Sequence, residues 1–194
     1  MEHISIRAAT GAADSTFIIS CIDKALPWLE SIGCGAQWGS EPWSENVAFC
    51  EVVKGLVDEP SEDLAKGVAW IADAMSGEEV VPAGAIILRN HSPSYAPQSS
   101  LVPVPEIYIR LLITDRTLGD LSKGVGAKLI DFARAVAKRE GVSLLRLDTW
   151  KGGDDALMRY YERQGFTRTG DFLIPDIYRP GQIFTGWVLE QWLV

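Results

Sequence analysis

The sequence predicts an α+β fold in which a mixed central β-sheet of about seven strands is flanked by about four helices. Segments with alternating apolar residues are interspersed with segments of helical spacing, in the order strand, two helices, three strands, helix, strand, helix, two strands. Strand–helix–strand successions in the second half predict the parallel part of the sheet. Because neither a repeat nor a linker divides the 194 residues, we expect a single domain over residues 1–194.

Composition and charge exclude several classes of protein. The chain is 47% hydrophobic and 23% charged, as packed globular domains are, and its net charge of −8 disfavours binding to nucleic acids or anionic membranes. That acidity favours a neutral or cationic partner. The sequence shows no signal peptide and no membrane-spanning apolar run, so a cytoplasmic location is expected. Neither a disulfide framework nor a zinc site is expected from the few cysteines and histidines, Cys21, Cys34, Cys50, His3 and His91.

In the first half, two amphipathic helices follow one strand and precede a hairpin. Pro27 is expected to kink or divide the first helix, and Ser40 is expected to cap the second, with Pro42 in its first turn. The proline- and serine-rich stretch 91–105 predicts a long binding or lid loop. The predicted elements are strand 4–8, helix 14–31, a helix from Pro42 through Val57, and strands 67–74 and 80–89.

In the second half, two buried strands are each followed by a helix that ends at a glycine. Nearly continuous apolar runs predict central strands covered on both faces. Gly141 and Gly165 supply the helix stops. The predicted elements are strand 106–115, a helix from Val125 to Gly141, strand 142–150, helix 154–165, and strands 166–174 and 183–193.

Gly124, Val125 and Gly126 lie where a loop enters the helix that follows the central strand. Unsatisfied N–H groups and the positive end of the helix dipole favour a phosphate there. The spacing fits neither of two common phosphate motifs. A P-loop requires lysine directly after its second glycine, where Val125 stands, and a dinucleotide fingerprint requires a third glycine, where Leu129 stands.

The segment Leu121–Gly126 resembles the pyrophosphate loop of the GNAT superfamily of N-acetyltransferases, [QR]xxGxG/A, although Leu121 replaces the usual Gln or Arg. The run LRLDTWKGGDDALMRYYERQGF resembles the family's LxLD strand and its YYExxGF helix. Residues 4–193 match the order of the family's elements. The resemblance is to small-molecule amine acetyltransferases, and it implies the GNAT fold and acetyl-CoA as co-substrate, without a metal. It also implies direct acetyl transfer to a primary amine in a ternary complex.

The resemblance implies that acetyl-CoA lies between the central strand and the LxLD strand. Backbone groups of the central strand would hold the pantetheine arm, and N–H groups of the glycine loop would hold the pyrophosphate. Asp154 stands in the place of the family's Asn. The implied cofactor-binding residues are Leu112, Ile113, Thr114, Ser122, Lys123, Gly124, Val125, Gly126, Ala127 and Asp154.

Acyl transfer to an amine requires a base for the amine proton and an acid for the leaving thiolate. The resemblance places Tyr161 at the acid position, while Tyr160 projects about 100° away around the helix and is the weaker candidate. An alkyl amine is protonated at pH 7, so a carboxylate has to remove its proton directly or through water. Asp148 belongs to the LxLD pattern. The full set of candidate bases, left unranked, is Asp148, Glu106, Glu41 and Glu45.

The segment from Gln37 and Trp38 to Trp43 resembles the acceptor loop of small-molecule GNAT enzymes. Its tryptophans can wall the pocket or stack on a cation. Strand alternation predicts that Tyr108 and Arg110 face the same cavity. Arg110 would suit an acceptor with a carboxylate, such as an amino acid, whereas the net charge favours a cationic acceptor. Two alternative functions are a catalytically silent acyl-CoA sensor and an acetyltransferase of protein or peptide amines. The protein is expected to be a monomer or a homodimer.

Overall fold

The computed structural model describes residues 4–98, 103–175, 181 and 183–193, and these form one seven-stranded mixed sheet with four α-helices. The predicted α+β class and the order of strands and α-helices are confirmed. Strand order across the sheet is β1-β2-β3-β4-β5-β7-β6. The elements are β1 (Ile4–Ala8), α1 (Gly11–Ser31), α2 (Val47–Val57), β2 (Val68–Ser76), β3 (Glu79–Arg89), β4 (Glu106–Thr114), α3 (Val125–Arg139), β5 (Leu144–Trp150), α4 (Ala156–Arg163), β6 (Thr167–Pro175) and β7 (Ile183–Trp192), with short 3-10 helices at Gly35–Gln37, Trp43–Glu45 and Arg116–Ser122.

Pro27 does not divide helix α1, which is continuous from Gly11 to Ser31. The predicted start of the second helix is wrong. Helix α2 begins at Val47, because the side chain of Asn46 accepts the N–H of Phe49 and caps it there. Ser40 therefore caps nothing, and the residues after Pro42 form a separate 3-10 turn.

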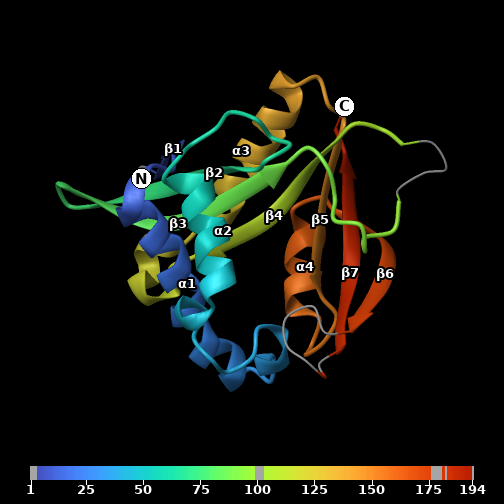
Figure 1. Cartoon of the computed structure of the whole chain (residues 1–194), viewed down its shortest axis with the longest axis horizontal. Helices are drawn as coiled ribbons and strands as arrows, with labels where there is room; N and C mark the ends of the chain where they lie inside the picture. The colour runs from blue at the N-terminus through green and yellow to red at the C-terminus, as the bar shows by residue number, and fades with distance from the viewer. Residues whose placement is uncertain (1–3, 99–102, 176–180, 182, 194) are drawn as a thin grey trace.

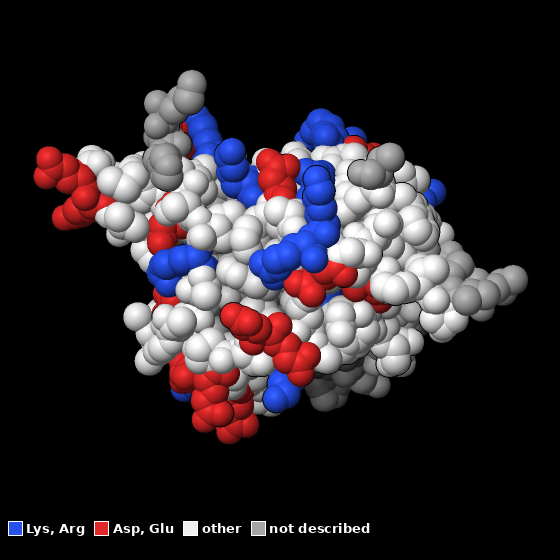
Figure 2. Space-filling model, turned by 90° about the horizontal axis from the view of Figure 1, so that it is seen from above, with Lys and Arg blue, Asp and Glu red and all other residues white. Residues whose placement is uncertain are grey.

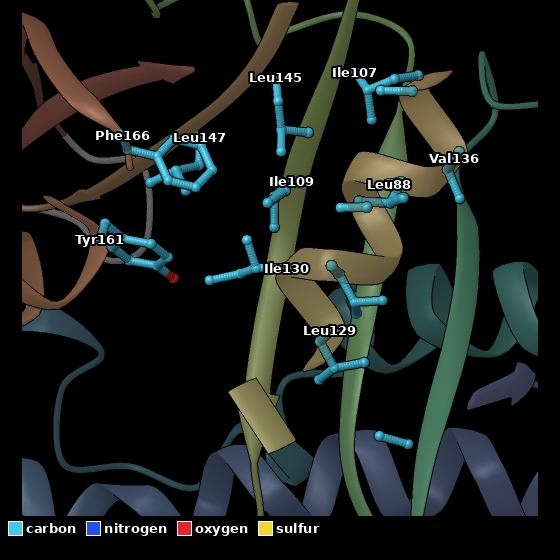
Figure 3. Packing of buried hydrophobic residues seen from close by; sticks show 14 of the residues in the cluster. Leu88, Ile107, Ile109, Leu129, Ile130, Val136, Leu145, Leu147, Tyr161 and Phe166 are labelled. Carbon is cyan, nitrogen blue, oxygen red and sulfur yellow. The ribbon is translucent and has the colours of Figure 1, made fainter. Parts of the chain in front are cut away.

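The helices cover both faces of the sheet, with α1 and α2 on one face and α3 behind the other (Figure 1). The α3 side has the larger core, in which Leu129, Ile130 and Val136 pack on strand residues such as Ile109 and Leu147 (Figure 3). Helix α4 adds Tyr161 to the same core. The two layers fix the positions of β4 and β5, which carry the candidate site.

Strands β4 and β5 form a short parallel ladder and then part. The ladder joins Glu106–Ile109 to Leu144–Leu147 and ends there. At the parting point β4 contains a bulge, because Leu88 and Ile87 of β3 pair with Ile109 and Leu111 and leave Arg110 without a register partner in β3. The bulge reverses the alternation, so Leu112 packs on the α3 side and Leu111 on the α1 side. The edge of β4 beyond Ile109 is therefore open toward β5.

The described parts of the predicted long loop, 91–98 and 103–105, lie between β3 and β4, and residues 99–102 fall outside the described residues. Segment 91–98 crosses β5 and is anchored by Arg146, which is 2% exposed. The guanidinium of Arg146 donates to Ser92 Oγ (3.0 Å), to the Pro97 carbonyl and to Glu106 Oε2 (2.8 Å). The loop is thus a packed cover over the face opposite α3.

Candidate active site

A cavity of about 930 Å³ lies at the parting of β4 and β5 and reaches both faces of the sheet. Its α3 side is lined by the glycine loop and α4, and its other side by α1, α2 and the loop between them. Most of the residues singled out from the sequence meet here. They are Gln37, Trp38, Trp43, Arg110, Leu112, Ile113, Thr114, Ser122, Gly124, Gly126, Ala127, Asp148, Asp154 and Tyr161.

The glycine loop presents the N-terminus of α3 to this cavity. Gly124 is the N-cap residue, with a φ of 79° that favours glycine, and the first intrahelical N–H bond belongs to Lys128. The N–H groups of Val125, Gly126 and Ala127 therefore have no partner within the helix, as an anion site requires. A Cβ on Gly126 would lie 2.7 Å from the Tyr160 hydroxyl, so glycine keeps the loop open. This cradle fits a pyrophosphate.

Two residues of the loop, Lys123 and Val125, do not line the cavity with their side chains, and their predicted contacts are through backbone N–H groups. The Lys123 side chain is exposed and pairs with Asp120 at 2.7 Å. Val125 is fully buried in the α3 core, so only its backbone is available to a ligand. Arg116, which sequence reasoning missed, does line the cavity, and its guanidinium lies 3.7 Å from the ring centroid of Trp28. Only its position directly after the central strand could have indicated it.

The open edge of β4 suits the pantetheine arm. Leu112, Ile113 and Thr114 line the cavity beyond the last β4–β5 pair. Their N–H and C=O groups on the β5 side lack a strand partner, because the ladder ends at Ile109. An amide-bearing chain can complete that edge by strand-like hydrogen bonds.

Tyr161 and Tyr160 both line the cavity from α4. Tyr161 is 7% exposed, and its hydroxyl points toward α3 at Ile130 (Figure 3). Its ring packs against those of Tyr160 and Phe166, at centroid distances of 5.3 and 5.9 Å. Burial raises the pKa of Tyr161, with the nearby Tyr160 and Asp148 adding to the shift. The hydroxyl therefore stays protonated at neutral pH and can donate.

Asp148 lines the cavity from β5, directly after the last residue of the ladder. Its Oδ1 accepts a hydrogen bond from the Tyr108 hydroxyl and lies 3.5 Å from the Tyr95 hydroxyl of loop segment 91–98. Burial raises the pKa of Asp148, whereas the Tyr108 hydrogen bond and the charge of Arg110 act in the opposite direction. A carboxyl with a raised pKa is better matched to proton transfer near neutral pH than an ordinary aspartate is.

The other three candidate bases lie elsewhere. Glu106 pairs with Arg146 at 2.8 Å, and its other oxygen accepts the Ser92 N–H, so it belongs to the anchor of loop segment 91–98. Glu41 and Glu45 are exposed and do not line the cavity. Of the two histidines, His91 is exposed and His3 lies outside the described residues. Asp148 is the candidate base that the cavity contains.

The predicted acceptor loop lines the cavity on the α1 side. The N–H of Trp43 donates to Asp23 of α1 (2.5 Å), and its indole Nε1 donates to the Trp38 carbonyl (3.0 Å). Its ring also packs edge-on against Phe49 of α2, with centroids 4.8 Å apart. The loop is therefore held against α1 and α2 and forms one wall of the cavity. Gln37 lines the same cavity.

The prediction that Tyr108 and Arg110 both face the cavity holds for Arg110 only. Tyr108 is fully buried and does not line the cavity, which it reaches only through Asp148. Arg110, the bulge residue, does line it. Arg89, at the end of β3, also lines the cavity, and no sequence pattern indicated it.

Asp154 lies in the turn before α4, not within the helix predicted over 154–165, because α4 begins at Ala156. Its carboxylate accepts the N–H of Ala156 at 3.0 Å, and it lines the cavity. It thus combines helix capping with proximity to the site.

Comparison with known proteins agrees with this arrangement. Residues 36–166 match the family model for the acetyltransferase (GNAT) family. A solved GNAT-family acetyltransferase from Desulfovibrio desulfuricans is 13% identical with a TM-score of 0.64, covering 99% of this chain and 100% of that chain. One from Listeria monocytogenes is 17% identical with a TM-score of 0.61, covering 98% and 95%. A chain of the NatC complex bound to Gag peptide and CoA is 18% identical with a TM-score of 0.56, covering 99% of each chain. No curated protein matches the sequence.

The chain belongs to the GNAT acetyltransferase family, and it is an acetyl-CoA-dependent acetyltransferase. Within the described residues, no group of His, Cys, Asp or Glu is arranged to hold a metal ion, and no helix is both long and apolar enough to cross a membrane. The face seen in Figure 2 carries acidic and basic side chains interspersed, without a broad basic surface.

Proposed function

We propose that this acetyltransferase acts on a primary amine of a small molecule by direct transfer in a ternary complex. The observation that carries the proposal is the presence of Asp148 and Tyr161 in one cavity, which opens to both faces of the sheet where β4 and β5 part. A site open to two sides can hold donor and acceptor together, and direct transfer requires this. A cytoplasmic location and a monomer or homodimer remain predictions.

Acetyl-CoA, when bound, supplies an acetyl group activated as a thioester. The N–H groups at the start of α3 and the open edge of β4 would hold its pyrophosphate and pantetheine. Asp148 would take the proton from the acceptor's ammonium group and leave the neutral amine that attacks. The Tyr161 hydroxyl would hydrogen-bond to the leaving sulfur or protonate it, since a thiolate of pKa about 8.5 is a competent acceptor.

The test is a thiol-release assay with acetyl-CoA over a panel of amines, amino acids, polyamines, aminoglycosides and a peptide with a free N-terminus. We expect turnover of a small amine, and a kcat about 100-fold lower in Tyr161→Phe at unchanged CoA affinity. Tyr160→Phe is the matched variant one residue away.

Three other outcomes would contradict separate parts of the proposal. Tight CoA binding without turnover of any acceptor would indicate a silent acyl-CoA sensor. Turnover confined to the peptide would indicate a protein or peptide acetyltransferase. Unchanged turnover in Tyr161→Phe would remove its role as the acid and leave the rest of the proposal intact.

A further inference from the structure

Two arginines line the acceptor side of the cavity, and they come from neighbouring strands. Arg89 ends β3 and pairs in register with Tyr108, two residues before Arg110 in β4. Arg110 acts electrostatically on both Tyr108 and Asp148, so it lies near them. Both arginines line the cavity that contains the candidate base.

Arg89 lacks the partners that a partly buried arginine ordinarily has. Its Nε is buried without a hydrogen-bond partner, and no ion pair to its side chain is found among the described residues. Its side chain lies against Leu56 of α2 and the backbone at Gly67, which offer it no carboxylate. A guanidinium in such surroundings is stabilised by an anion that accepts two parallel hydrogen bonds.

Local charge on this side of the cavity is opposite in sign to the net charge of the chain. Asp148 is the acidic residue that lines this side of the cavity together with Arg89 and Arg110, and burial disfavours its ionised form. The other acidic lining residues, Asp154 and Asp155, lie in the turn before α4. Surface carboxylates more than about 10 Å away are screened by salt, so the two nearby arginines dominate the field that a ligand meets.

The remaining wall on this side is apolar. Helix α2 and the turn before it contribute Trp43, Phe49, Val52 and Leu56 to the cavity lining. An acceptor that complements this site has an apolar group for the wall, an anionic group for the arginines and an amine for the base.

We propose that the acceptor is an amino acid with an apolar side chain, whose carboxylate is bound by Arg89 and Arg110 and whose amine faces Asp148. This deepens the proposed function and rests on it. It replaces the cationic acceptor favoured by the net charge. It also extends the carboxylate hypothesis for Arg110 to a two-arginine site.

The experiment compares phenylalanine with phenylalaninamide, which keeps the side chain and the amine but lacks the carboxylate. The kcat/KM ratio of acid to amide is measured in wild type, Arg89→Gln, Arg110→Gln and, as a control, Arg139→Gln at the exposed end of α3. The two amines differ in basicity, but this difference affects the ratio equally in every protein and so drops out when variants are compared with wild type. We expect the ratio to fall about 10- to 100-fold in Arg89→Gln and Arg110→Gln, as loss of a charge-assisted hydrogen bond predicts, and to stay unchanged in Arg139→Gln.

An equal ratio in wild type and both cavity variants would overturn the inference without affecting the proposed function. If Arg89→Gln fails to fold, Arg89→Lys keeps the charge but loses the planar fork, and a several-fold fall in the ratio is expected. If no amine is acetylated, the proposed function fails. Calorimetric titration of phenylalanine into the CoA-bound protein then decides the inference: binding that Arg89→Lys weakens supports it, and absence of binding overturns it.

Discussion

The Tyr108 hydroxyl of β4 donates a hydrogen bond to Asp148 of β5 across the point where the two strands part. Both groups are buried on the same side of the sheet, and the bond joins the residues that flank the end of the ladder. Tyr108 does not line the cavity, but its hydrogen bond holds the candidate base, Asp148, in place there. Tyr108 is a positioning residue, and its effect should appear in the pH dependence of the reaction.

Tyr108→Phe should move the acidic limb of the kcat/KM profile to higher pH. The Tyr108 hydrogen bond lowers the pKa of Asp148 against the larger effect of burial, so its removal raises that pKa further. Because the base must be ionised, activity is lost over the pH range between the old and the new pKa. We expect the limb to move to higher pH with full recovery of activity at alkaline pH, measured as a pH–rate profile. A profile that coincides with wild type would contradict this role, and Asp148→Asn should abolish the limb.

Gly126→Ala should weaken acetyl-CoA binding without destabilising the fold. The new Cβ would lie 2.7 Å from the Tyr160 hydroxyl, which has to move, and both residues line the cavity at the start of α3. Alanine is the better helix former by roughly 1 kcal/mol, so the melting temperature should not fall. We expect the KM for acetyl-CoA to rise about tenfold while kcat is preserved, because a methyl group at the phosphate cradle obstructs binding but not the reacting groups. Adding Tyr160→Phe removes the clashing oxygen and should restore part of the affinity, and failure to do so would show that the clash is not the cause.

Asp23→Ala should impair acceptor binding from a distance. Asp23 holds the N–H of Trp43 at 2.5 Å and so fixes the wall of the acceptor side. We expect a several-fold higher KM for the acceptor and an unchanged dissociation constant for CoA, because the tether lies on the α1 side. Steady-state kinetics measures the KM for the acceptor, and calorimetry measures the dissociation constant for CoA. Asp131→Ala, at an exposed position of α3, serves as the control.

Arg7→Met should destabilise the fold in a pH-dependent way. Arg7 bonds to Asp14 at 2.6 and 2.9 Å and to Asp73 at 2.8 Å, and both carboxylates are 5% exposed. The hydrogen bonds from Arg7 lower the pKa of Asp14 despite its burial. The stabilisation is therefore present above the unfolded carboxylate pKa of about 3.9 and is lost as pH falls through the lower folded pKa.

The expected cost for Arg7→Met at pH 7 is about 2 kcal/mol. This is less than the roughly 3–5 kcal/mol for breaking a fully buried pair, because the Arg7 side chain is 43% exposed. Urea unfolding at pH 7 and at pH 3 measures the difference. A cost that is equal at both pH values would exclude the ion pairs as its source, and Arg139→Met at an exposed pair should change little at either pH.

Periodicity was sufficient to predict the sheet and the placement of the glycine loop, because these depend on patterns within single segments. Leu112–Thr114 therefore lie in β4 and Gly124 lies at the start of α3, as predicted. The start of α2 was missed because serine and asparagine are both good caps, and the structure uses Asn46 rather than Ser40.

Predictions about side-chain environment failed where they depended on contacts between distant segments. Glu106 is a carboxylate and was therefore a candidate base, but it forms an ion pair with Arg146, which lies 40 residues later in the sequence. Strict alternation placed Tyr108 in the cavity with Arg110, but Tyr108 is fully buried and its hydroxyl donates to Asp148 instead. Arg89 could not be selected because its lack of a partner is visible only once α2 and β2 are packed around it.

Among the described residues, the four-pair ladder between β4 and β5 is the strand pairing that joins strands β1–β4 to strands β5–β7. Each half is an antiparallel unit with its own ladders, so the parallel seam is the shortest connection in the sheet. A ligand that contacts β4, the start of α3 and α4 at once would bridge the two halves. Its binding free energy would then oppose separation along the seam and would slow amide hydrogen exchange there first, in both strands together.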